Sequence, residues 1–418
     1  MKKSVNIISL TIMIGIIVAA WSGASVASDT KLQPLPIILK SKDVLEKDLL
    51  QGENYTINPS VMNDGLINTY HLSTDYGSFE MESTAGLMNR INELNALRKM
   101  EALEQSGVFK DSLVEGVKAP ISGVVDLVKS PIETTKGFIS GTGKFLSNMG
   151  HAIVSDDPNQ DNVLKVAIGY DAAKRAYAYE FGINPYSSYE PLINRLGQIA
   201  RSAVAGGLVP RATLAVIDED FATVMSISAF TKNIRKLLRD SSPSDLHKIN
   251  KEKLEKLGIA SPLAEDFLSN YSYDPQERTL LVAELERMAD VQGLEVFIAA
   301  ADTSTDRSVA FLYRLIAEMM AGYHTKVTPV ERIADIGGTL FLQKMDDTLV
   351  MTIPVDFVFK TKEVAAKLDS FNKGIQAPDK VTGKELWIAG KIDKAALTMF
   401  ETGGWKVTEN ANSILMKE

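Results

Sequence analysis

The chain has 418 residues, enough for two or three domains of ordinary size. It is 45% hydrophobic and 23% charged, a composition that excludes a disordered chain, a collagen, a polytopic membrane protein and a disulfide-rich miniprotein. The formal net charge of −8 argues against a general nucleic-acid binder. The chain has no cysteine, which excludes disulfides, thiolate metal sites and thiol nucleophiles. We therefore expect neither a nucleic-acid partner nor a thiolate metal site.

Residues 1–27 have the layout of a secretory signal peptide. A short positive start precedes a mostly apolar stretch over 5–21. Ser25 and Ala27 would occupy the −3 and −1 positions of a cleavage site before Ser28. The alternative is an uncleaved membrane anchor, but the apolar run is short for a membrane span and small residues follow it. The sequence predicts an exported protein, periplasmic or peripheral to an envelope membrane.

Residues 28–82 are predicted to form a β-rich N-terminal segment. Two prolines predict an irregular lead-in over 28–50. From 53 to 82, short runs rich in Thr, Tyr and Ile are separated by Asn-Asp-Gly at 63–65 and Asp-Tyr-Gly at 75–77. These sequences are typical of hairpin turns, so we expect a small β-meander.

The spacing of apolar residues becomes helical after Ser83 and predicts a multi-helix core over 83–330. Ser-Pro, Asp-Pro and Gly positions mark where individual helices start and stop. No fixed repeat length is visible, so a helical solenoid is not expected. The predicted helices lie near 83–100, 156–181, 189–205, 210–239, 243–257, 261–270, 275–290, 291–302 and 305–323.

A small C-terminal α/β domain is predicted over 331–418. Two strand-like stretches at 338–344 and 348–359 are joined by an acidic hairpin tip. A helix at 361–372 follows, and then a strand, a short helix and a strand at 385–392, 393–402 and 405–409 make a miniature β-α-β unit. The predicted fold class is therefore α+β, dominated by helix.

The segment 107–150 is the least usual part of the chain, with seven glycines and five lysines. An interior glycine costs about 1 kcal/mol relative to alanine in a helix, so the segment is a weak helix former with an apolar stripe. One interpretation is a set of short helices or loops that wrap the helical core. The other is a mobile amphipathic element that contacts a membrane or partner surface mainly through apolar burial. The candidate contact residues are Phe109, Leu113, Val117, Val124, Val128, Phe138, Ile139, Phe145 and Leu146.

Motifs that would bind a nucleotide or a metal are incomplete. The stretch 137–145 resembles a phosphate-binding loop but lacks its first glycine and the Ser or Thr after Lys144. The four histidines lack metal spacing, and acidic stretches at 157–168 and 302–313 lack the glycine and glutamate of calcium loops. We therefore expect no metal, cofactor or nucleotide, and we assign the acidic positions to helix capping.

Three stretches, FGINPYSSYEPLINRL (181–196), YDPQERTLLVAELERM (273–288) and ELWIAGKIDKAALTMFETGGWKV (385–407), support a resemblance. The chain resembles a family of exported proteobacterial proteins of uncharacterised function. This resemblance covers most of the chain after the signal peptide. It implies a Gram-negative envelope setting and supplies no activity and no catalytic residue.

The first functional hypothesis is a non-enzymatic, exported cell-envelope protein that binds a partner or the membrane surface through 107–150. The second is an envelope hydrolase with a site at the interface of the helical core and the C-terminal domain, since pockets favour such interfaces. The absence of G-x-S-x-G removes a nucleophile elbow but leaves other hydrolase designs open. A third hypothesis is a structural scaffold without a ligand.

Overall fold

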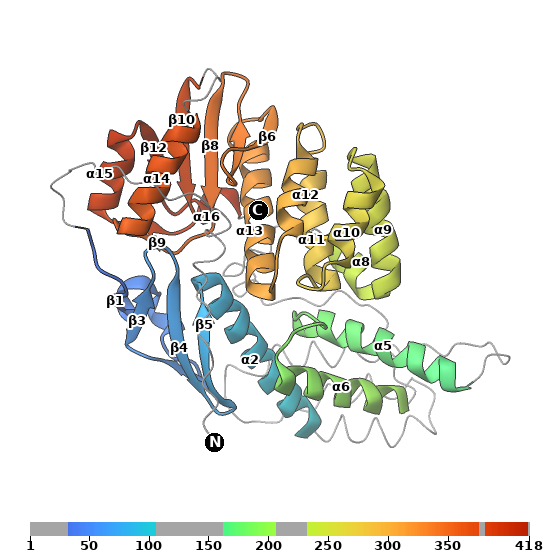
Figure 1. Ribbon diagram of the computed structural model, residues 1–418. Helices are drawn as coiled ribbons and strands as arrows, with labels where there is room; N and C mark the ends of the chain where they lie inside the picture. Colours follow the sequence, from blue (N-terminus) through green and yellow to red (C-terminus); the bar gives the residue numbers. More distant parts are fainter. Residues whose placement is uncertain (1–31, 106–161, 206–231, 376–380, 417–418) are drawn as a thin grey trace. The chain divides into compact units, whose positions relative to one another are not determined.

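The computed structural model describes residues 32–105, 162–205, 232–375 and 381–416, which form parts of two compact units (Figure 1). The first unit combines the chain up to Gly86 with the chain from His247 onward, and the second is Leu87–Leu246. The predicted α+β class, with a strand meander, a multi-helix core and C-terminal strands and helices, is confirmed. The helices of 83–330 are shared between the two units. The predicted contact residues of 107–150 lie outside the described residues.

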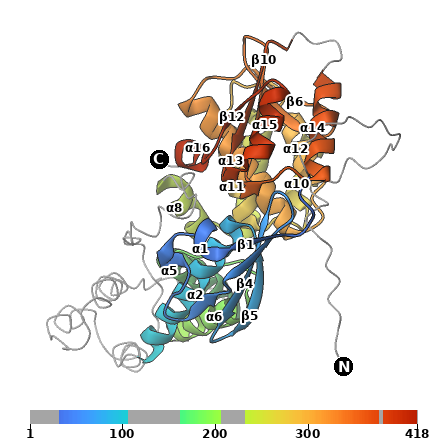
Figure 2. The same ribbon diagram turned by 90° about the vertical axis from the view of Figure 1, so that its left-hand side faces the viewer.

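The N-terminal sheet of the first unit contains the predicted meander. Its strands are antiparallel, and β4 and β5 run alongside one another in both views (Figure 1, Figure 2). Gly65 and Gly77 have φ values of 103° and 116° at the two predicted turns, where glycine avoids a Cβ clash. The strands of the meander are β2 (Tyr55–Ile57), β3 (Ser60–Asn63), β4 (Asn68–Thr74) and β5 (Gly77–Glu82).

The lead-in over 28–50 is more regular than expected. Strand β1 (Ile37–Lys40) pairs antiparallel with β3, and the short helices α1 (Ser41–Val44) and η2 (Lys47–Leu49) follow it. The apolar run of β1 is too short to show alternation. Its extended conformation depends on a partner strand more than twenty residues away, so local sequence did not reveal it.

Two helices of the first unit begin at predicted capping residues. Asp274 accepts hydrogen bonds from the N–H groups of Gln276 and Glu277, and Asp306 caps the next long helix through Val309 N–H. The helices are α9 (Pro243–Lys256, whose first turn belongs to the second unit), α10 (Ser261–Ser269), α11 (Pro275–Glu286), α12 (Leu294–Asp302) and α13 (Arg307–Lys326). Their apolar faces form one core, in which α13 is buried over most of its length.

The C-terminal sheet of the first unit has the order β12-β10-β8-β7-β6. Strands β8, β10 and β12 are parallel, whereas β6 and β7 complete an antiparallel edge. The elements are β6 (Arg332–Asp335), β7 (Leu340–Gln343), β8 (Thr348–Ile353), β10 (Gly383–Ile388) and β12 (Trp405–Thr408), with the crossover helices α14 (Lys362–Ile375) and α15 (Lys394–Thr402). The predicted β-α-β unit is confirmed, and β8-α14-β10 makes a second one.

Both faces of this sheet are buried, in agreement with its parallel centre. Leu342, Val350 and Trp387 belong to the same core as α13, whereas Leu349 and Leu386 pack with residues of α14 and α15. The short helix α16 (Asn412–Leu415) packs on α13, and β9 (Phe357–Val358) pairs with β11 (Lys391–Ile392). The period-2 alternation of β10 therefore decides which of its side chains face α13.

The second unit is helical in its described part. Its helices are α2 (Thr84–Gln105, whose first turn belongs to the first unit), α5 (Asn162–Phe181), α6 (Glu190–Ala205) and α8 (Lys232–Asp240). Helix α5 packs on α6 and α8, and it stops at the predicted Gly182. Arg195 of α6 forms ion pairs with Glu101 and Glu104 of α2. None of the described helices combines the length and the apolar character needed to span a membrane.

Candidate functional site

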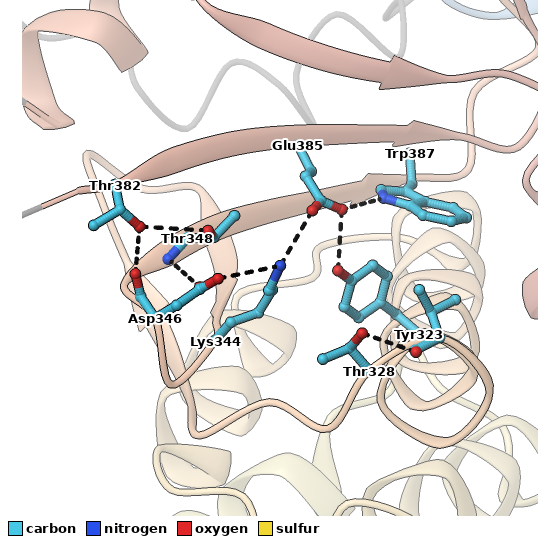
Figure 3. Close-up of polar contacts among 9 residues, drawn as sticks. Tyr323, Thr328, Lys344, Asp346, Thr348, Thr382, Glu385 and Trp387 are labelled. Atoms are coloured by element: carbon cyan, nitrogen blue, oxygen red, sulfur yellow. Dashed lines mark hydrogen bonds and ion pairs between the residues drawn. The ribbon is translucent and has the colours of Figure 1, made fainter.

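A polar cluster centred on Glu385 lies where α13, β10 and the β7–β8 hairpin meet (Figure 3). The carboxylate of Glu385 accepts a hydrogen bond from Tyr323 Oη at 3.0 Å and another from Trp387 Nε1 at 2.9 Å. The Nζ atom of Lys344 lies 3.3 Å from its second oxygen. Three donors from three elements therefore converge on one carboxylate.

Alternation along β10 explains why Glu385 meets these partners. Glu385 and Trp387 are two residues apart, so they share the face of the strand that covers α13. Tyr323 extends from α13 and stacks edge-on against Trp387, with 5.3 Å between ring centroids. Both aromatic rings are nearly buried, and this packing holds their polar atoms at the carboxylate.

The tip of the β7–β8 hairpin extends the cluster toward solvent. Lys344 Nζ is 3.7 Å from the carboxylate of Asp346, which also accepts a hydrogen bond from Thr348 N–H at 3.0 Å. The hydroxyl of Thr382 donates to the carbonyl of Asp346. The predicted acidic hairpin tip is thus fastened to the residue that precedes β10 (Figure 3).

The electrostatic environment keeps Glu385 ionised. Burial raises the pKa of this carboxyl, but the hydrogen bonds from Trp387 and Tyr323 and the charge of Lys344 outweigh burial and hold the pKa below its usual value. Burial and the neighbouring Glu385 raise the pKa of the Tyr323 phenol, so the phenol stays protonated. A carboxyl with a lowered pKa is already ionised near neutral pH and is a weak base, so the cluster favours a fixed ion pair over proton transfer.

A second cluster joins α11 and α13 inside the same unit. Arg314 Nε lies 2.7 Å from Glu277, and Arg314 Nη1 lies 3.0 Å from the fully buried Glu318. Two turns beyond Glu277, Glu284 of α11 pairs with Arg287, which follows the last residue of the helix. Burial raises the pKa of Glu277 to about 7 despite the nearby Arg314. These charges lie between packed helices, so they form a structural network rather than a substrate site.

Two of the described histidines, His247 and His324, make structural contacts. His324 is buried at the end of α13, where its Nδ1 accepts a hydrogen bond from Val330 N–H at 3.1 Å. Its Nε2 lies 3.1 Å from Asp290, and His247 contacts Glu265 at 3.0 Å. Across the described ranges, no group of three or more His, Asp or Glu side chains is placed to hold a metal ion.

Neither polar cluster was among the candidate sites predicted from the sequence. The strand at 385–392 and the acidic hairpin tip at 345–347 were predicted, but nothing in the sequence placed Glu385 beside the hairpin. Tyr323 lies 62 residues away from Glu385, and no local pattern indicates that they meet. The Arg314–Glu318 spacing is an ordinary helical ion-pair signal, but burial of that pair was not apparent from the sequence.

Removing the carboxylate of Glu385 should destabilise the first unit. We expect Glu385→Ala to lower the free energy of unfolding by about 2–3 kcal/mol, because Tyr323 and Trp387 lose their acceptor and Lys344 loses an ionic partner. Glu385→Gln keeps an acceptor oxygen and should cost less. Urea unfolding followed by tryptophan fluorescence measures both variants, and equal stability of Glu385→Ala and the wild type would contradict this role.

Comparisons of the chain with models of protein families, with curated proteins and with solved structures find no match. The function is therefore inferred from the sequence and from the geometry of the described residues.

Proposed function

We propose that the protein is exported to the cell envelope and acts there by binding a partner or the membrane surface rather than by catalysis. The binding element is the segment 107–150, with the nine apolar contact residues named above. The layout of 1–27 supports export, and the apolar stripe among glycines supports surface binding.

The observation that carries the preference for binding over catalysis is that Glu385 is held by three structural donors. The interface of 83–330 with 331–418 is where a hydrolase site was expected, and Glu385 is the carboxylate found there. Its two oxygens already have three donors, and its pKa is held low. A carboxylate held ionised by three fixed donors supports the fold of the interface and is a weak base for a substrate proton.

The alternative proposal is an envelope hydrolase at the same interface. It is favoured by the convergence of a carboxylate, an amine and a phenol, and by the partial exposure of Glu385 and Lys344, at 14% and 18% of their side chains. In that function Lys344 would have to release Glu385 before the carboxylate could act as a base. Loss of a measurable ester, amide or glycoside hydrolysis in Glu385→Gln would support it.

Fractionation of the native host tests the binding proposal. We expect the protein to stay with the membrane fraction after a high-salt wash, because apolar burial is insensitive to screening. Replacing Phe138, Ile139, Phe145 and Leu146 by serine should release it to the soluble fraction, since each buried apolar side chain contributes about 1.5–3 kcal/mol.

The matched control is Glu385→Gln, which should stay with the membrane. Circular dichroism of the serine variant must match the wild type, so that release is not caused by unfolding. A wild-type protein found wholly in the soluble periplasm, together with no bound partner on gel filtration, would contradict the proposal.

A further inference from the structure

The second unit has a concentration of basic side chains at the packing of α5 with α8. Helix α8 contains four basic residues and one acidic residue among nine. Leu238 is buried, whereas Lys236 is exposed and Arg235 and Arg239 are partly exposed. Packing against α5 therefore involves both the buried Leu238 and the partly exposed arginines, and Lys236 points to solvent.

Two arginines of α8 are held by an aromatic ring. The guanidinium carbons of Arg235 and Arg239 lie 5.0 Å and 5.2 Å from the centroid of Tyr179 on α5. Arg175, also on α5, donates through Nε to the carbonyl of Arg239 at 3.4 Å. Cation–π contacts of this kind fix guanidinium groups in place without neutralising them. We refer to Arg175, Arg235, Lys236 and Arg239 as the α8 basic surface.

Nearby acids only partly compensate this charge. Asp240 forms a bidentate pair with Arg239, at 2.6 Å and 2.8 Å. Arg235 forms no ion pair with any residue that the structure describes, and Glu180 is the carboxyl whose charge acts on it. Burial raises the pKa of Glu180 to about 7, so this carboxyl is only partly ionised at neutral pH. The α8 basic surface is thus a cationic region on a chain whose net charge is −8.

We propose that the α8 basic surface docks on the anionic headgroups of a phospholipid membrane. The partner follows from charge complementarity, because arginine forks bind phosphate oxygens and clustered basic residues attract anionic lipid. This inference rests on the proposed function in the case where 107–150 binds a membrane. It adds an electrostatic attraction between the α8 basic surface and the lipid headgroups. The segment 107–150 carries five lysines against four acids, so it supplies apolar burial and little charge.

The test is co-sedimentation of the mature chain with phosphatidylcholine vesicles that contain or lack phosphatidylglycerol, at low and high salt. The variant Arg235→Gln/Lys236→Gln/Arg239→Gln removes three cations. Each basic residue near an anionic surface contributes about 1 kcal/mol, so we expect the partition coefficient on phosphatidylglycerol vesicles at low salt to fall on the order of a hundredfold. High salt should abolish most of the difference between the variant and the wild type.

The matched control is Lys391→Gln/Lys394→Gln/Lys406→Gln, which removes three exposed cations from the first unit. It changes the net charge equally and should leave binding within about twofold, since only charges near the lipid contribute. Circular dichroism confirms that each variant is folded.

The outcomes separate this inference from the proposed function. If the α8 variant binds phosphatidylglycerol vesicles as the wild type does while the serine variant of 107–150 is released, the α8 surface is refuted and the proposed function stands. If the α8 variant loses binding and the serine variant keeps it, the inference stands and the role of 107–150 falls. A wild-type chain that binds neither vesicle refutes both membrane roles.

Discussion

We expect Arg314→Met to lower the free energy of unfolding of the first unit by about 3–5 kcal/mol. Arg314 lies between Glu277 and the fully buried Glu318, and methionine would leave both carboxylates without their cation. An uncompensated buried charge costs far more than the lost packing. Urea unfolding monitored by tryptophan fluorescence reports on this unit, because both described tryptophans, Trp387 and Trp405, belong to it.

A variant that removes all three charges of the network separates the loss of charge compensation from the loss of packing. Arg314→Met/Glu277→Gln/Glu318→Gln removes the cation together with both anions and should recover most of the stability. If Arg314→Met alone is as stable as the wild type, the network does not contribute to folding. If the triple variant is no better than the single one, packing rather than charge explains the loss.

The second large effect is expected at Asp356, which joins the segment before β9 to the N-terminal sheet and the start of α2. Its carboxylate accepts hydrogen bonds from Asn68 N–H and Thr84 N–H, both at 2.8 Å. Asp356→Ala leaves both backbone donors without their acceptor and should cost about 2–4 kcal/mol in the free energy of unfolding. Limited proteolysis should then cut within 53–86 faster than in the wild type.

The pH dependence of stability gives an independent check. Burial raises the pKa of Asp356 to about 6, above its unfolded value, so the folded state binds a proton that the unfolded chain releases. This carboxyl therefore makes the wild type more stable as the pH falls from 7 toward 4. Asp356→Asn removes that titration and should flatten the slope. A variant with an unchanged slope would show that Asp356 is not the group responsible.

Local features of the fold could be predicted because they depend on neighbours within one turn. Asp274 and Asp306 cap their helices through N–H groups two or three residues ahead, and Gly182 ends α5 in a left-handed conformation. The turn at 75–77 works in the same way, with a glycine at positive φ between alternating strands. These positions are encoded by the residues themselves.

Two short strands, β1 and β6, were not predicted from the sequence. β1 and β6 have four residues each and lie at sheet edges, so their apolar runs are too brief for a period to be recognised. The division of the helices between two units was not predicted either. The sequence indicated one continuous helical core over 83–330, because those helices follow one another along the chain. The structure instead joins the N-terminal sheet to the C-terminal helices and strands.

The α+β class, the helix caps Asp274 and Asp306 and the hairpin turns could be predicted from local sequence. Long-range packing brings Glu385 to Tyr323 and Lys344, 62 and 41 residues away, and Asp356 to Asn68 across 288 residues. Capping and alternation act within a few residues, so the local sequence specifies them. The long-range hydrogen bonds exist because burial of the shared core brings distant segments together, and no local pattern records which segments those are.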